Sequence, residues 1–202
     1  GDGVELLHGH AVLDFQPVFP GAGVIAWLRE PKARAASEFI HLKARRREEN
    51  PIFTAVHDGE AGFADFLAAR GPIYSHVLER LGETPLALLP TEKPHAVLSA
   101  CAETLGWRGD FPRRNAAPPD QAEAARRLIA EHAGLLERTL APDIALHRSL
   151  LEDWERGEGR ARAEAILAAG PRRAPPGQAA RLRRRAGVLR EALGRALGRD
   201  WR

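Results

Sequence analysis

The feature that most limits the possible folds is a nearly continuous apolar run that stops at a charged turn. Residues 23–28 (GVIAWL) contain no charged side chain, and Arg29, Glu30 and Pro31 follow directly. A short uninterrupted apolar run is typical of a strand in a buried parallel sheet. Pro31 suits the first turn of a helix, because its missing N–H would have no partner there anyway. The run therefore predicts a buried parallel strand that leads directly into a helix.

Further short apolar runs occur along the chain, and segments with a helical pattern lie between them. Apolar runs at 4–7 and 85–89 predict two further strands, and Asn50-Pro51 is interpreted as a break. Strands that alternate with helices imply an α/β domain with a central parallel sheet and a helix-rich C-terminal half. After the helix that begins near Pro31, further helices are expected at 62–70, 73–81, 94–105, 120–140 and 143–154.

Charge divides the chain into a body and a basic tail. Residues 171–202 hold ten Arg against Glu191 and Asp200, a net charge of +8, whereas the rest carries 20 Lys and Arg against 25 acids, or −5. We therefore expect a domain over 1–170, followed by a basic linker and an amphipathic helix. Because the positive charge belongs to the tail, it is no evidence that the body binds nucleic acid. No apolar run approaches the roughly 18 residues that span a bilayer.

Arg29, Arg34 and Ser37 form a pattern suited to an anion. Arg29 is expected at the carboxyl end of a parallel strand, where α/β sheets bind ligands, and just before a helix N-terminus, which attracts anions. Arg34 and Ser37 share a helix face. A guanidinium holds phosphate with two parallel donors, and a hydroxyl adds a third. In the alternative interpretation Arg34 is a solvated charge, Ser37 has no special role and Arg29 pairs with Glu38.

The pattern R-x-P-x-x-R-x-x-S after an apolar strand resembles the 3′-phosphate-binding motif of sulfotransferases that use 3′-phosphoadenosine-5′-phosphosulfate (PAPS). Residues 6–15 (LLHGHAVLDF) resemble the HGH segment of the heparan sulfate and uronyl 2-O-sulfotransferases, and residues 37–43 are similar to the helix after their motif. Residues 142–150 resemble their D-x-x-L-Y helix, with His147 in place of Tyr. The resemblance implies a P-loop-like three-layer fold and a carbohydrate O-sulfotransferase.

The resemblance also implies roles for individual residues. Arg29 and Ser37 would hold the 3′-phosphate of PAPS, and Arg34 would brace the motif. His10 matches the family's proposed catalytic base, and His8 matches a neighbouring histidine also implicated there. Chemistry agrees with these roles, because sulfuryl transfer to an alcohol needs a base for the hydroxyl proton and imidazole titrates near neutrality.

A metal site is the alternative for the two histidines at positions 8 and 10, because a His-x-His pair can bind a metal. Such a site needs a third ligand, and Asp14, His41 and His57 are available without a telling spacing. We therefore expect no metal, PAPS as the sulfate donor, and a sugar or glycan hydroxyl as the acceptor.

One part of the family pattern is missing from the sequence. These enzymes bind the 5′-phosphosulfate with a Gly-rich, Lys-containing loop upstream of the HGH segment. Only seven residues precede His8, residues 20–23 (PGAG) lack the Lys, and the chain contains no Met. We therefore expect that loop in preceding sequence, and we expect the chain alone to lack transferase activity.

Two other functions are compatible with the sequence. The missing loop favours a non-catalytic nucleotide-binding remnant or interaction module, and the basic tail suggests a binder of nucleic acid or a membrane surface. Our first hypothesis is a PAPS-dependent O-sulfotransferase with no specific nucleic-acid partner and no transmembrane segment. The single cysteine, Cys101, excludes an internal disulfide and favours a reducing, cytoplasmic location.

Overall fold

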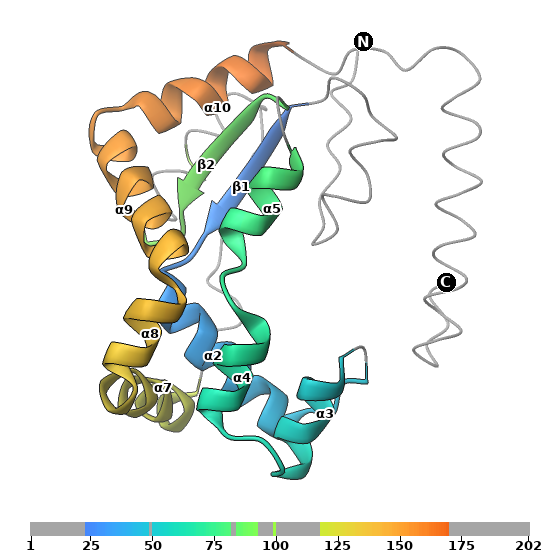
Figure 1. The fold of residues 1–202 in the computed structure, drawn as a ribbon. Helices are drawn as coiled ribbons and strands as arrows, with labels where there is room; N and C mark the ends of the chain where they lie inside the picture. The colour runs from blue at the N-terminus through green and yellow to red at the C-terminus, as the bar shows by residue number, and fades with distance from the viewer. Residues whose placement is uncertain (1–22, 49, 82–83, 93–98, 100–117, 170–202) are drawn as a thin grey trace, which may run out of the picture. The chain divides into compact units, whose positions relative to one another are not determined.

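The computed structural model describes residues 23–48, 50–81, 84–92, 99 and 118–169, and residues 23–168 pack as one unit. This unit is a mixed α/β structure in which helices predominate (Figure 1). Its elements in chain order are β1 (Val24–Leu28), α2 (Pro31–Ala44), α3 (Pro51–Asp58), α4 (Phe63–Arg70), α5 (Tyr74–Leu81), β2 (Leu86–Pro90), α7 (Pro119–Glu131), α8 (Ala133–Thr139), α9 (Ala141–Glu155) and α10 (Glu158–Ala169).

β1 and β2 form a two-stranded parallel sheet. The register runs from Val24 opposite Leu86 to Leu28 opposite Pro90, so both strands end at the same edge of the sheet. The sequence prediction of an α/β structure with these two parallel strands is confirmed. The strand predicted at 4–7 lies outside the described residues.

α2 begins two residues after β1 ends because the second of these residues, Glu30, caps it. The Glu30 carboxylate accepts the N–H groups of Lys32 at 3.1 Å and Ala33 at 2.6 Å, and Pro31 occupies the first turn. The helix then places small and apolar residues at helical spacing against its neighbours, and its buried residues include Ala35 and Phe39. The turn and the helix start are therefore determined within a few residues of sequence.

Two apolar clusters stabilise the unit. The larger lies where α2, α3, α4 and α8 meet, and it contains Phe39, Phe63 and Phe66, whose ring centroids are 5.1 to 6.2 Å apart. The smaller lies on the sheet, where Ala87 of β2 packs with Ala163 of α10. The first cluster holds the helices together, and the second places α10 along the sheet (Figure 1). Within the described ranges, no helix is both long enough and apolar enough to cross a membrane.

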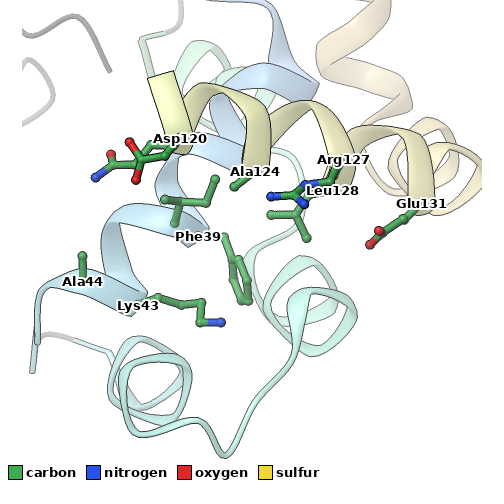
Figure 2. A pocket seen from close by; sticks show the side chains of 10 residues that line it. Phe39, Lys43, Ala44, Asp120, Ala124, Arg127, Leu128 and Glu131 are labelled. Atoms are coloured by element: carbon green, nitrogen blue, oxygen red, sulfur yellow. The ribbon is translucent and has the colours of Figure 1, made fainter. Parts of the chain in front are cut away.

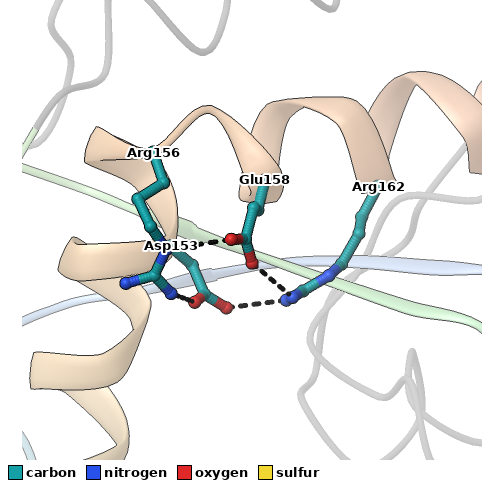
Figure 3. Close-up of polar contacts among 4 residues, drawn as sticks. All are labelled: Asp153, Arg156, Glu158 and Arg162. Carbon is teal, nitrogen blue, oxygen red and sulfur yellow. Dashed lines mark hydrogen bonds and ion pairs between the residues drawn. The ribbon is translucent and has the colours of Figure 1, made fainter.

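A closed set of ion pairs marks the corner between α9 and α10 (Figure 3). Gly157, which follows the C-cap residue Arg156 of α9, adopts a left-handed conformation with φ of 79°. Arg156 contacts Asp153 at 2.5 Å and Glu158 at 2.9 Å, while Arg162 contacts the same two acids at 2.7 and 3.2 Å. The amino-acid sequence does not predict α10, because its alanine-rich residues lack a clear apolar stripe.

Two further helix predictions differ from the structure. Asn50-Pro51 predicts a break, whereas in the structure Asn50 caps α3 by accepting the N–H of Ile52 at 3.1 Å. The predicted helix over 120–140 is divided into α7 and α8 at His132, where φ is −112° and ψ is 21°. The helix predicted at 94–105 and the basic segment at 171–202 lie outside the described residues, except that Ser99 is helical.

Candidate anion-binding site

The turn between β1 and α2 is held by two side chains from other elements. The Tyr74 hydroxyl donates to the carbonyl of Arg29 at 3.0 Å and accepts the Arg29 N–H at 3.2 Å. The Glu92 carboxylate, just after β2, accepts the N–H of Glu30 at 2.7 Å. Three consecutive backbone polar groups at the end of β1 therefore have fixed partners.

Tyr74 is itself held in place by a buried carboxylate of α9. Asp143 is only 2% exposed, and it accepts the N–H groups of Ile73, Tyr74 and Ser75 at 2.7, 3.0 and 2.9 Å. The Ser75 hydroxyl adds a fourth bond at 3.0 Å. A carboxylate at this position satisfies N–H groups that a helix start leaves unpaired, and it complements the helix dipole. α9 thereby fixes the start of α5.

His147 lies one turn after Asp143, on the same face of α9, and it is buried. Its Nε2 is 3.4 Å from the Glu92 carboxylate, which is close enough for an ion pair when the imidazole is protonated. The geometry is not that of a hydrogen bond, so Nε2 has no hydrogen-bond partner among the described residues. Both residues that hold the turn are thus in contact with α9, Tyr74 through the bond from its backbone N–H to Asp143 and Glu92 through its carboxylate beside His147.

Arg34 stacks on the ring of Tyr74, with its guanidinium carbon 4.9 Å from the ring centroid. This distance is typical of a cation–π contact. Its Nη1 atom is buried and has no hydrogen-bond partner within the described part of the chain. Arg34 is therefore not the solvated charge of the alternative interpretation. Glu38 pairs with Arg70 at 3.3 Å, rather than with Arg29 as that interpretation proposed.

Arg29 and Ser37 complete the predicted set. Arg29 is exposed, and its guanidinium makes no hydrogen bond or ion pair with another described residue. Ser37 is half-buried on α2, one turn after Arg34. Tyr74 contacts both arginines, whereas no hydrogen bond joins Ser37 to them in the described ranges. His8 and His10 lie outside the described residues.

The expectation that the N-terminus of α2 attracts a ligand anion needs correction. The N–H groups of Lys32 and Ala33 are already bound by the Glu30 carboxylate. The protein therefore supplies its own anion at this helix start, only one residue after Arg29. A ligand phosphate would have to rely on guanidinium and hydroxyl groups, with Glu30 opposing it electrostatically.

A separate groove of ≈550 Å³ lies between α2 and α7 (Figure 2). Its charges are mixed, since Lys43 and Arg127 lie near Asp120 and Glu131. Of the predicted site residues that the structure describes, Arg29, Arg34 and Ser37, none lines it, so it is distinct from the β1–α2 turn. The lining residues are Phe39, Ile40, Lys43, Ala44, Asp120, Gln121, Ala124, Arg127, Leu128 and Glu131.

Of the three further metal ligands named from the sequence, the structure describes His41 and His57. His41 is exposed in the last turn of α2, and His57 on α3 has its Nδ1 3.3 Å from the carbonyl of Leu42. Among the described residues, no group of three or more His, Cys, Asp or Glu is arranged to hold a metal ion. Asp14 lies outside them.

Sequence reasoning missed Tyr74 and Glu92, and it noted Asp143 only within a resembling segment. No local spacing identifies the first two, because they lie 45 and 62 residues from the backbone groups they bind. The one available signal was composition, since Tyr74 is the only tyrosine in the chain.

That single tyrosine gives a direct test of its surroundings. Burial of the phenol is the largest cause that raises the pKa of Tyr74 above its usual value, and the nearby carboxylates of Asp143 and Glu92 raise it further. The positive charge of Arg34 and the hydrogen bond from the Arg29 N–H lower the pKa, but by less. We expect tyrosinate absorbance to appear above pH 10 in the native protein and at roughly pH 10 in denaturant.

The same shift links Tyr74 to stability. A pKa that is higher in the folded state contributes stability below the unfolded pKa, and this contribution is lost as pH rises through the folded pKa. The free energy of unfolding should therefore fall above about pH 10, and less so in Tyr74→Phe. A native titration at or below that of the denatured chain would contradict the burial of the phenol.

Comparison with known proteins found no matching family model, no matching curated protein and no matching solved structure. Functional assignment therefore depends on the residues of the site.

Proposed function

We propose that the protein is a PAPS-dependent O-sulfotransferase and that the β1–α2 turn binds the 3′-phosphate of the donor. One observation carries the proposal. The Tyr74 hydroxyl binds both the N–H and the carbonyl of Arg29, while the Arg29 guanidinium is exposed and has no partner among the described residues. A fixed backbone with an uncommitted cation at the end of a parallel strand is well suited to a phosphate.

Two neighbouring groups support phosphate binding. Arg34 has a buried Nη1 donor without a partner in the described part of the chain, and an unpaired buried donor is costly unless something accepts from it. Ser37 offers a hydroxyl one turn further along α2. In this proposal Arg29 and Ser37 bind the phosphate and Arg34 braces the motif, stacked on Tyr74.

The proposed reaction moves a sulfuryl group from the phosphosulfate anhydride to a hydroxyl of a sugar or glycan. The acceptor oxygen bonds to sulfur as the bond from sulfur to the bridging phosphate oxygen breaks, and adenosine 3′,5′-bisphosphate leaves. His10 is proposed to take the hydroxyl proton, with His8 in a secondary role. We further propose that the two parallel strands belong to a P-loop-like three-layer fold.

Nucleotide binding tests the proposal directly. By calorimetry, adenosine 3′,5′-bisphosphate should bind more tightly than adenosine 5′-monophosphate. Arg29→Ala should reduce that preference by roughly 10- to 150-fold, because a hydrogen bond to a charged group contributes about 1.5–3 kcal/mol.

Arg127→Ala is the matched control, because it removes the same charge from an exposed position on α7. Its preference should equal that of the wild type. Equal affinities for the two nucleotides in a folded wild-type sample would contradict the proposal. In a form of the protein that includes the Gly-rich, Lys-containing loop, preferential binding without sulfate transfer to any glycan in a labelled-donor panel would favour the non-catalytic nucleotide-binding alternative.

A further inference from the structure

Tyr74 connects the candidate site to a distant helix. Its hydroxyl binds both backbone groups of Arg29, and its ring lies against the guanidinium of Arg34. Its own N–H is bound by Asp143 of α9. A single side chain therefore contacts two arginines of the proposed phosphate site without being placed to bind the phosphate itself, because both hydrogen-bonding roles of its hydroxyl are occupied.

The next backbone group, the N–H of Glu30, is also bound by a side chain that contacts α9. Glu92 accepts the N–H of Glu30 and lies 3.4 Å from Nε2 of His147. Asp143 and His147 are one helical turn apart on α9. The turn that carries Arg29 is thus fixed by the side chains of Tyr74 and Glu92. The same face of α9 contacts both residues, Tyr74 at its backbone N–H and Glu92 at its carboxylate.

We infer that Tyr74 and Glu92 are positioning residues that set the preference of this site for the 3′-phosphate by fixing the Arg29–Glu30 backbone against α9. The inference rests on the proposed function, in which only Arg29 and Ser37 bind the phosphate. Arginine binds phosphate well only when its planar group is correctly oriented, so loss of backbone restraint should weaken phosphate recognition. Contacts to the rest of the nucleotide should be less affected.

Tyr74→Phe is the first test. Phenylalanine keeps the ring against Arg34 and removes only the hydroxyl that binds Arg29. We expect the ratio of bisphosphate to monophosphate affinity to fall roughly 3- to 15-fold, with monophosphate affinity nearly unchanged. Ser75→Ala is the matched control, because it removes a hydroxyl one residue along the same helix that bonds Asp143 and not Arg29.

A double-mutant cycle separates positioning from a general structural role. If Tyr74 acts through Arg29, Tyr74→Phe should change the ratio little once Arg29 is alanine. Equal loss of affinity for both nucleotides would overturn the inference, because this is the result expected of a merely structural residue. An unchanged ratio in Tyr74→Phe would overturn it as well.

Glu92 gives a second test that does not alter Tyr74. Glu92→Ala and Glu92→Gln both remove a negative charge, but only glutamine can still accept the Glu30 N–H. We expect the nucleotide preference to be higher in the glutamine variant than in the alanine variant, and equal preferences would contradict a positioning role for Glu92. A wild-type protein without any preference would refute the proposed function itself. A wild-type preference that survives in all three variants would refute only this inference.

Discussion

Replacing Asp143 with alanine is expected to lower the free energy of unfolding by about 3–5 kcal/mol, the range typical of breaking a buried charged network. The carboxylate is 2% exposed and accepts four hydrogen bonds at the start of α5. Alanine would leave three backbone N–H groups and the Ser75 hydroxyl without this partner. Urea denaturation, followed by circular dichroism, measures the change.

Asp120→Ala provides the control for Asp143→Ala. Asp120 also lies in the first turn of its helix, α7, but it is exposed. Its removal should cost no more than about 1 kcal/mol, the usual contribution of an exposed acid near a helix N-terminus. A loss of similar size in the two variants would show that Asp143 acts only through the helix dipole and not through its buried hydrogen bonds.

His10→Ala is expected to have the largest effect on catalysis. In a form of the protein that transfers sulfate, turnover should fall by about 100- to 10,000-fold, because the variant lacks the proposed general base. Affinity for adenosine 3′,5′-bisphosphate should change little, since His10 is assigned to the acceptor proton. Single-turnover transfer from labelled PAPS, with calorimetry alongside, measures both quantities.

His76→Ala is the matched control for His10→Ala. The His76 side chain is exposed on α5, with its Nδ1 3.7 Å from Glu79, outside the proposed chemistry. It should keep wild-type turnover. Wild-type turnover in His10→Ala would remove that residue from the mechanism, whereas His8→Ala is expected to have a milder effect.

The parts of the fold that could be predicted are those encoded by local pattern. The apolar run ending at Leu28 and the run at 85–89 form the two parallel strands, because uninterrupted apolar residues suit a buried strand. α3 was missed because Asn50-Pro51 is compatible with either a break or a helix start, and tertiary context selects the latter. α10 was missed because its alanine-rich sequence packs on the sheet without a clear apolar period.

In the candidate site, too, local sequence spacing predicted the positions of residues, whereas contacts between residues far apart in the chain could not be predicted. The spacing of Arg29, Arg34 and Ser37 places them on one strand–turn–helix unit, as predicted. Sequence spacing did not reveal that Glu30 would occupy the N-terminus of α2. It also gave no indication of Tyr74, because a contact across 45 residues has no local signature.

Because α9 restrains the β1–α2 turn, the turn cannot be fixed until late in the synthesis of the chain. Once β2 has been made, the chain already contains Arg29, Arg34, Ser37 and the tyrosine that binds the first of them. It does not yet contain Asp143, which lies 69 residues beyond Tyr74. A nascent chain at that stage carries the phosphate-binding residues without the helix that orders them. Closure of such long loops is slow compared with local helix formation, so ligand recognition should be acquired late, only after α9 has emerged and docked.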